Sequence, residues 1–264
     1  MDITLASKTL LVTGSTQGLG LSIAEHAANS GVPGLIISGR DESRGTQAAE
    51  RLSNERTKAI FVQADLSNPE APAALFAQAE KVFGGVDLVV NSAGLTNRGG
   101  FLDGDLKTWD TLFNVNARAA FFIMQEAING FLKRKVPGSI VNILSMNAHC
   151  GSPELSIYSA TKGALTTLTK NAANSFLANK IRVNGINMGW APTDSEMKMQ
   201  AEVLGKGADW VEEASRAMPL GRMLTADEVA RTAIFLLSDF SIPMTGVTVD
   251  LEQMVVGAPN RGTK

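Results

Sequence analysis

The chain has 264 residues, of which 44% are hydrophobic and 19% are charged, a balance typical of a globular protein rather than a disordered one. Its net charge of −2, with scattered basic residues, gives no reason to expect a nucleic-acid partner. The apolar runs are too short for a membrane span, and the N-terminus does not resemble a signal peptide. Because Cys150 is the only cysteine, no internal disulfide can form. We therefore expect a soluble protein of the cytoplasm with no membrane partner.

Short apolar strands alternate with longer helical stretches. In chain order, the predicted strands are Thr9–Thr13, Leu35–Ser38, Ala59–Gln63, Leu88–Asn91, Ser139–Leu144, Ile181–Ile186 and Val247–Val249. The predicted helices between them are 18–29, 43–53, 69–83, 108–133, 157–178 and 226–238. Strands this apolar are typical of a parallel sheet covered on both faces. We predict an α/β fold, a Rossmann-type doubly wound parallel sheet of about seven strands in a single domain spanning 1–264.

Two helix starts carry capping signals, Ser67-Asn68-Pro69-Glu70 and Thr225-Ala226-Asp227-Glu228. The segment at about 190–222 shows the least regular pattern. It follows the sixth predicted strand, where insertions in doubly wound sheets contact ligands. We therefore predict that this segment, called the lid below, is a mobile cover over the substrate.

A glycine-rich turn follows the first predicted strand, in Thr13-Gly-Ser-Thr-Gln-Gly-Leu-Gly20. Gly14, Gly18 and Gly20 lack side chains where a pyrophosphate would approach backbone N–H groups at a helix N-terminus. The spacing is GxxxGxG rather than GxGxxG, and the glycines alone would also suit a tight strand–helix connection.

The only tyrosine, Tyr158, lies four residues before Lys162 in Tyr158-Ser-Ala-Thr-Lys162. Residues at this spacing share a helix face, and an ammonium group there favours the phenolate, which predicts a lowered tyrosine pKa suited to acid–base catalysis. A surface pair is the simpler alternative. Ser145, at the end of the fifth predicted strand, favours a catalytic site because strand ends and helix starts converge at one sheet edge.

These motifs together resemble the short-chain dehydrogenase/reductase family over nearly the whole chain. The resemblance rests on TGSTQGLG (13–20), Asp65-Leu66, Asn91-Ser-Ala-Gly94, NVNAR around Asn116, Ser145, YSATK (158–162) and NMGWAPT (187–193). It implies an NAD(P)-dependent oxidoreductase that transfers a hydride between the nicotinamide and a secondary alcohol or ketone.

The resemblance also implies residue roles. Tyr158 is the acid/base, Ser145 orients the substrate oxygen, Lys162 binds the nicotinamide ribose, and Asn116 kinks its helix and holds a water. The expected catalytic set is thus Asn116, Ser145, Tyr158 and Lys162. The expected cofactor contacts are Gly14, Ser15, Gln17, Gly18, Leu19, Gly20, Arg40, Asp65, Leu66, Asn91, Ala93, Gly94, Tyr158, Lys162, Gly189, Ala191 and Thr193. The chain departs from the family pattern at Ser92 and at Met188-Gly189, where a proline is usual, and we expect the latter change to loosen its loop.

The end of the second strand, Ser38-Gly39-Arg40, favours NADP over NAD. Glycine replaces the acid that binds a ribose 2′-hydroxyl, and Arg40 suits a 2′-phosphate, with Ser15 adding a hydroxyl. Asp41 adds an acid next to Arg40, and Gln17 replaces a basic residue often found in that loop. Both favour NAD, which remains the alternative.

Polar residues near the catalytic set favour a sugar or polyol as the small-molecule substrate, with expected contacts at Ser145, Asn147, His149, Tyr158 and Trp190. By resemblance, the tail from Leu251 also favours carbohydrate metabolism. His149 is equally well read as a structural loop residue, and Cys150 as pocket lining. A 3-oxoacyl-thioester reductase and a non-catalytic dinucleotide-binding sensor or scaffold are the alternatives. His26 and His149 form no ligand cluster, so no metal is expected.

The long helices at 108–133 and 157–178 carry apolar residues on more than one face, including Phe121 and Phe122. One sheet face needs fewer, so we expect a homo-oligomer, specifically a homotetramer.

Overall fold

The computed structural model describes residues 3–207 and 209–258. Within this part of the chain, seven parallel strands form one sheet in the order β3-β2-β1-β4-β5-β6-β7. The strands are β1 (Thr9–Val12), β2 (Gly34–Gly39), β3 (Lys58–Gln63), β4 (Leu88–Asn91), β5 (Gly138–Ile143), β6 (Ile181–Met188) and β7 (Thr248–Leu251). The predicted doubly wound α/β fold is confirmed.

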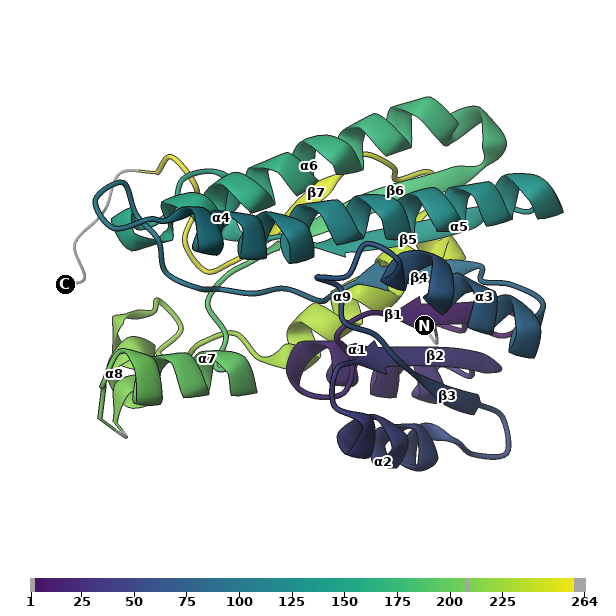
Figure 1. Cartoon of the computed structure of the whole chain (residues 1–264), viewed down its shortest axis with the longest axis horizontal. Helices are drawn as coiled ribbons and strands as arrows, with labels where there is room; N and C mark the ends of the chain where they lie inside the picture. Colours follow the sequence, from purple (N-terminus) through teal and green to yellow (C-terminus); the bar gives the residue numbers. More distant parts are fainter. Residues whose placement is uncertain (1–2, 208, 259–264) are drawn as a thin grey trace.

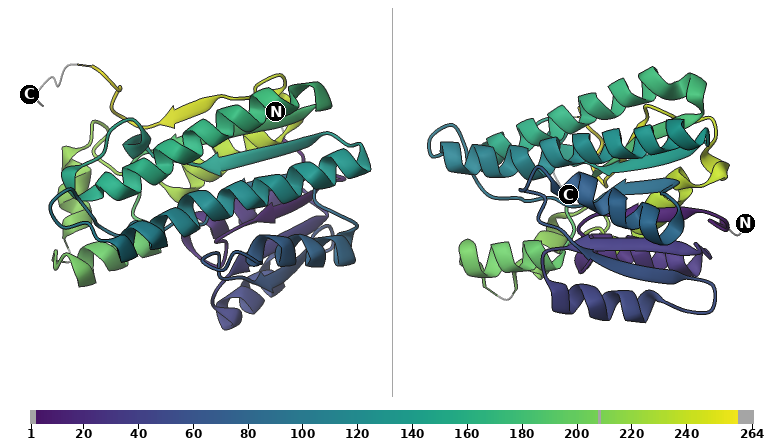
Figure 2. Two further views of the ribbon diagram at one scale, coloured as in Figure 1. Left: turned by 45° about the horizontal axis from the view of Figure 1, so that its top comes forward. Right: turned by 45° about the vertical axis from the view of Figure 1, so that its right-hand side comes forward.

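Helices cover both faces of this sheet. They are α1 (Gly18–Asn29), α2 (Glu42–Leu52), α3 (Ala71–Phe83), α4 (Leu106–Phe113), α5 (Ala120–Arg134), α6 (Ser156–Phe176), α7 (Asp194–Lys198), α8 (Trp210–Ala217) and α9 (Ala226–Leu237). One core cluster joins the sheet to α1, α2 and α9, and a second joins its other face to α3, α5 and α6. In all three views α5 and α6 run side by side along their face (Figures 1 and 2).

The strand β1 shows why these segments form a parallel sheet. Leu10, Leu11 and Val12 are all fully buried. Leu10 and Val12 pack into the first cluster and Leu11 into the second, as the alternation of side chains along a strand requires. A continuous apolar run is therefore buried on both sides.

Most element ends differ from the predicted bounds by one or two residues, and three regions show how. The predicted helix 108–133 begins at Leu106 and contains a π-helical turn at Asn114–Ala119 between α4 and α5. The third helix begins at Ala71, because the side chain of Asn68 accepts from the Glu70 N–H and holds Pro69 in a turn. The irregular lid contains α7, α8 and a π-helical turn at Met199–Val203.

The strand order reverses between β1 and β4, which lie side by side in the sheet. Connections leave these two strands in opposite directions, so a crevice opens beyond their carboxyl ends. The chain segments after β1, β4, β5 and β6 converge there. Among the helices of the described chain, none has the length and apolar character that a bilayer crossing requires.

Candidate active site

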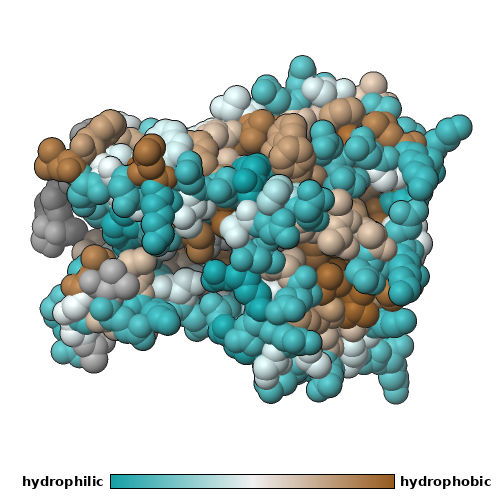
Figure 3. Space-filling view, viewed as in Figure 1, coloured by the Kyte–Doolittle hydropathy of each residue, from teal (hydrophilic) through white to brown (hydrophobic). Residues whose placement is uncertain are grey.

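A cavity of about 700 Å³ extends along the carboxyl edge of the sheet. Its lining runs from the glycine turn after β1, past the ends of β2, β4 and β5, to the lid. The space-filling view shows the molecule hollowed between the part that carries α4 and the part that carries α7 and α8 (Figures 1 and 3). A cavity of this size is within the usual range for a small-molecule site.

Close backbone packing shapes the glycine turn. A Cβ atom at Gly14 would lie 2.7 Å from the Ala93 Cα, and one at Gly20 would lie 2.3 Å from the Gly14 carbonyl oxygen. Gly14 and Gly18 also adopt positive φ angles of 62° and 53°. The turn leads directly into α1, so backbone N–H groups at this helix N-terminus border the cavity. This cradle fits the pyrophosphate of a dinucleotide.

Ser15 does not face the cavity. Its hydroxyl donates to the Val12 carbonyl at 2.6 Å and accepts from the Ser38 N–H at 3.0 Å, so it ties β1 to β2. The cavity lining includes Thr16 instead. A Cβ atom at Gly39 would lie 2.7 Å from the Thr16 side chain, so glycine at 39 leaves room for this threonine.

Two arginines border the cavity beyond the end of β2. Arg40 is exposed, and Arg44, which the sequence-based site omitted, lies one turn into α2. The Arg44 Nε donates to Asp41 at 2.8 Å, and its guanidinium also contacts Gln17. Because Asp41 is both the N-cap of α2 and the partner of Arg44, its carboxylate is engaged within the protein. Asp65 lines the same end, and its hydrogen bond from the Ser67 N–H lowers its pKa.

Ser145, Tyr158 and Lys162 meet at the centre of the cavity. Ser145 follows β5, while Tyr158 and Lys162 lie one turn apart near the start of α6. All three side chains are buried. The Lys162 Nζ donates to the Ile143 carbonyl at 2.8 Å and lies 5.8 Å from the centroid of the Tyr158 ring. The sequence motifs thus come together in space.

The prediction that Lys162 lowers the pKa of Tyr158 is wrong for this structure. Burial raises the pKa of Tyr158 to about 12, the charge of Glu196 adds to the increase, and Ser145 and Arg98 oppose it. Burial lowers the pKa of Lys162 to about 8. The physical reason is that burial disfavours the charged form of each group, and a partner one helical turn away does not offset this effect.

Asn116 lies within the π-helical turn and does not line the cavity. Its side chain bridges the loop after β4 and helix α6: Oδ1 accepts from the Leu95 N–H at 2.8 Å, and Nδ2 donates to the Leu95 carbonyl at 2.9 Å and to Thr161 at 3.1 Å. The expected distortion of its helix is therefore present, in the form of a π turn. A Cβ atom at Gly94 would lie 3.6 Å from the Lys162 Nζ, so this loop closely approaches Lys162.

The substrate end of the cavity contains Asn147 and Trp190, as predicted, together with Arg98, Glu196 and Gln200, which the sequence-based site omitted. These three residues come from separate segments with no shared motif, so the sequence offered little signal for them. His149 does not line the cavity: its ring pairs with Asp250 of β7 at 3.0 Å. Cys150 is exposed rather than part of the lining, which corrects that expectation.

The segment at Met188-Gly189 is not loosened by the missing proline. Met188 continues β6 and pairs with Leu251 of β7, and the Gly189 N–H donates to the Leu251 carbonyl at 2.9 Å. A Cβ atom at Gly189 would collide with the Glu252 carboxylate. The sheet therefore fixes this side of the cavity.

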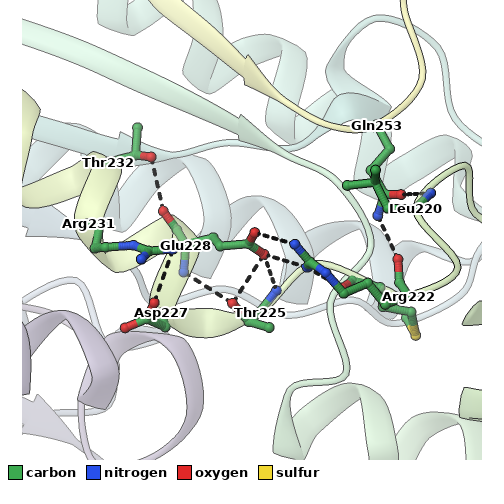
Figure 4. A network of polar contacts seen from close by, with 9 residues as sticks. Leu220, Arg222, Thr225, Asp227, Glu228, Arg231, Thr232 and Gln253 are labelled. Atoms are coloured by element: carbon green, nitrogen blue, oxygen red, sulfur yellow. Dashed lines mark hydrogen bonds and ion pairs between the residues drawn. The ribbon is translucent and has the colours of Figure 1, made fainter.

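A polar network anchors the end of the lid (Figure 4). Both guanidinium nitrogens of Arg222 donate to Glu228, at 3.0 and 2.8 Å, and Glu228 completes the predicted capping box with Thr225 at the start of α9. Gln253 accepts from the Leu220 N–H at 2.8 Å and donates to the Arg222 carbonyl at 2.6 Å. The lid is thereby tied both to α9 and to the segment after β7.

The structure thus brings most of the predicted cofactor residues to the cavity. Asn91 is the other exception besides Ser15: it is buried in β4 and donates to Asn142 at 2.8 Å. The predicted residues that line the cavity are Gly14, Gln17, Gly18, Leu19, Gly20, Arg40, Asp65, Leu66, Ala93, Gly94, Tyr158, Lys162, Gly189, Ala191 and Thr193. In the described residues, no three His, Cys, Asp or Glu side chains are grouped as a metal site would need.

Comparison with known proteins agrees with this geometry. A family model described as enoyl-(acyl carrier protein) reductase matches residues 14–252. The chain is 36% identical to L-xylulose reductase of Bos taurus, over 96% of this chain and 98% of the relative. It is 32% identical to 3-oxoacyl-[acyl-carrier-protein] reductase of Aquifex aeolicus, over 94% and 97% of the two chains.

Among solved structures, L-sorbose reductase of Gluconobacter frateurii, complexed with NADPH and L-sorbose, superposes with a TM-score of 0.91 at 25% identity, covering 98% of this chain and 100% of the other. This chain belongs to the short-chain dehydrogenase/reductase family, whose members are NAD(P)-dependent oxidoreductases acting on alcohol and ketone groups.

Proposed function

We propose that this chain interconverts a ketone and a secondary alcohol on a small sugar or polyol, with NADP as the preferred cofactor. The observation that carries the proposal is the convergence of Ser145, Tyr158 and Lys162 on the cavity that begins at the glycine turn. The glycine turn would hold the pyrophosphate of a bound dinucleotide, and the part of the cavity beside Ser145, Tyr158 and Lys162 would receive its nicotinamide.

The chemistry requires a proton and a hydride. When bound, the nicotinamide supplies or accepts the hydride at the substrate carbon. Tyr158, held as the neutral phenol by burial, donates its proton to the carbonyl oxygen during reduction. Ser145 would donate a hydrogen bond to the same oxygen, and Lys162 would hold the ribose hydroxyls of the cofactor. Asn116 acts through position, because it fixes the loop after β4 against α6.

NADP is favoured by the residues beyond β2. Gly39 places no acid against a ribose 2′-hydroxyl, while Arg40 and Arg44 offer two cations for a 2′-phosphate. Thr16 supplies the hydroxyl that we first assigned to Ser15. The Asp41 carboxylate, which would favour NAD, is engaged by Arg44.

The polar substrate end and the similarity to L-xylulose reductase and L-sorbose reductase favour a sugar or polyol. A 3-oxoacyl thioester is the second candidate, supported by the Aquifex relative. Its acyl chain would lie against Arg98, Glu196 and Gln200 and would leave these polar groups without partners, which costs affinity. The cavity therefore favours the hydroxylated substrate.

Initial rates test this function directly. We expect NADPH-dependent reduction of ketoses such as L-xylulose and L-sorbose, followed by nicotinamide absorbance. Tyr158→Phe, which removes only the hydroxyl, should lower kcat by at least about 100-fold and leave NADPH binding intact. Equal rates in both proteins would reject the catalytic assignment. Tight cofactor binding without turnover of any alcohol or ketone would favour the sensor or scaffold alternative.

We also propose that the chain acts as a homotetramer in the cytoplasm. Exposed apolar side chains on α4 and α5, among them Trp109, Phe121 and Phe122, support association. The single cysteine, which can form no internal disulfide, suits a reducing compartment.

A further inference from the structure

A buried carboxylate faces the reacting end of the cavity. Glu196 is the third residue of α7, and its side chain is only 11% exposed. Its Oε1 accepts from the Trp190 Nε1 at 3.0 Å and from the Gln200 Nε2 at 2.6 Å, and the Arg98 guanidinium lies 3.7 Å away. Three groups from two sides of the cavity thus converge on one oxygen and fix the orientation of the carboxylate.

The second carboxylate oxygen of Glu196 takes part in none of the hydrogen bonds or ion pairs found among the described residues. A glutamate at the third residue of a helix usually accepts from the backbone N–H of the N-cap residue. Thr193 caps α7 and accepts from the Glu196 N–H at 3.4 Å, but the carboxylate does not return to the cap. At the corresponding position of α9, Glu228 completes its capping box with Thr225. Glu196 therefore turns away from the helix end and toward the cavity.

Two neighbours of Glu196 carry polar atoms that find no hydrogen-bond partner within residues 3–207 and 209–258. Gln200 is 2% exposed, and its Oε1 is buried without a hydrogen-bond donor. The Arg98 Nε is buried without an acceptor. Such atoms are costly unless a ligand or water completes them. These two atoms are themselves buried, whereas the second Glu196 oxygen is not among the buried unpartnered atoms of that part of the chain and can accept from a substrate hydroxyl; a carboxylate only accepts, and an alkyl chain does neither.

The charge of Glu196 also reaches the reacting atoms. It raises the pKa of Tyr158 while Arg98 lowers it, and both side chains line the same cavity as the phenol. Arg98 is paired with Oε1 of this carboxylate, so it is already engaged and does not offer a free cation to an anionic substrate group. An anionic group placed near the reacting carbon would meet the fixed carboxylate.

We propose that Glu196, held by Trp190, Gln200 and Arg98, is the specificity-determining residue of this cavity: it binds the hydroxyl groups of a neutral polyhydroxylated ketone or alcohol and discriminates against substrates that carry a carboxylate. This inference rests on the proposed sugar or polyol activity and narrows it to uncharged substrates.

The wild-type enzyme provides the first test. L-sorbose and 5-keto-D-gluconate have the same number of carbons and differ in a terminal hydroxymethyl group or carboxylate. We expect kcat/KM with NADPH to be at least about tenfold higher for L-sorbose. Equal efficiency, or a preference for the keto acid, overturns the inference. If neither these compounds nor L-xylulose is reduced, the proposed sugar activity itself fails.

Glu196→Gln provides the second test, because it removes the charge and keeps the shape. The ratio of kcat/KM for L-sorbose to that for 5-keto-D-gluconate should fall by at least about tenfold. Glu196→Asp keeps the charge but retracts it, so it should lower kcat/KM for L-sorbose while still rejecting the keto acid. An unchanged ratio in Glu196→Gln overturns the inference while leaving the sugar activity intact.

Glu202→Gln is the matched control. Glu202 follows Glu196 in the same lid segment, but its side chain is 65% exposed and pairs with Lys198 at 3.8 Å. This variant should keep the wild-type ratio. Melting temperature and NADPH affinity of each variant report whether the fold and cofactor site persist. A shift of the ratio in Glu202→Gln equal to that in Glu196→Gln would also contradict the assignment.

Discussion

At the scale of single residues, we propose that the cavity end beyond β2 determines the choice between NADP and NAD. A charge-assisted hydrogen bond to a phosphate contributes about 1.5 to 3 kcal/mol. We therefore expect Arg40→Ala and Arg44→Ala each to lower kcat/KM for NADPH by roughly tenfold or more, with little effect on NADH. Steady-state kinetics with both cofactors measures this.

Arg51→Ala is the control for these two variants. Arg51 also belongs to α2, but it pairs with Glu25 at 2.9 Å and does not line the cavity. It should behave as the wild type with both cofactors. Equal losses for NADPH and NADH in Arg40→Ala and Arg44→Ala would contradict recognition of a 2′-phosphate.

The pKa of Tyr158, raised to about 12, predicts different pH profiles for the two directions of reaction. Reduction uses the neutral phenol, which is the populated form throughout the neutral range. Oxidation needs the phenolate, whose population rises with pH below that pKa. Between about pH 6 and about pH 10, kcat/KM for alcohol oxidation should increase by up to about tenfold per pH unit, and that for ketone reduction should not increase. A flat oxidation profile would contradict this.

At the scale of elements, the strands were the most predictable part of the chain. The strand at Leu88–Asn91 was predicted with the bounds that the structure shows, because its apolar run leaves few alternatives in a sheet buried on both sides. The motifs after β1 and β5 placed Gly14, Ser145 and Tyr158 at one sheet edge, because the carboxyl ends of parallel strands lie at the same edge. Once the topology is known, strand ends determine where the site lies.

The π turn and the substrate wall could not be predicted in this way. Asn116 in the π turn exchanges hydrogen bonds with the Leu95 backbone and donates one to Thr161, and both partners are distant in sequence. Glu196 occupies the Thr193-x-x-Glu196 spacing of a capping box, which favours a structural interpretation. Only the fold shows that Trp190 and Gln200 hold its carboxylate instead.

The polar contacts drawn in Figure 4 attach the end of the lid, and their contribution to the free energy of unfolding can be measured. The hydrogen bond from Arg222, together with that from the Thr225 N–H, lowers the pKa of Glu228 to about 2, from its ordinary value of 4.5. We expect Glu228→Ala to lower the free energy of unfolding by about 1 to 2 kcal/mol, because it removes a capping-box partner and a partly exposed ion pair. Chemical denaturation at neutral pH measures this loss.

The pH dependence of that loss provides its control. Because the pKa is lower in the folded state, the stabilisation by Glu228 is present above about pH 4.5 and disappears as the pH falls toward about 2. The difference between wild type and Glu228→Ala should shrink over this window. Glu212→Ala, which breaks an exposed pair with Arg216, should cost less than about 0.5 kcal/mol. Equal losses in the two variants would contradict a special role for the network.

At the scale of the whole molecule, the face formed by α4 and α5 predicts association. Phe121 and Phe122 are each 39% exposed and lie edge to face, with ring centroids 5.2 Å apart. Leu106 and Trp109 on α4 are more exposed still. Covering such side chains in a second copy removes apolar surface from water, which stabilises by about 25 cal/mol for each Å² buried.

We therefore expect sedimentation at micromolar concentration to show a homotetramer, and Phe121→Glu to shift it toward smaller species by placing a charge in the covered surface. Gln47→Glu introduces the same charge at an exposed position of α2 and should leave the assembly unchanged. Association requires the apolar face but not the cavity, so Phe121→Glu should lose assembly before it loses NADPH binding. A wild-type monomer at this concentration would show that the exposed phenylalanines are not an interface between copies of this chain.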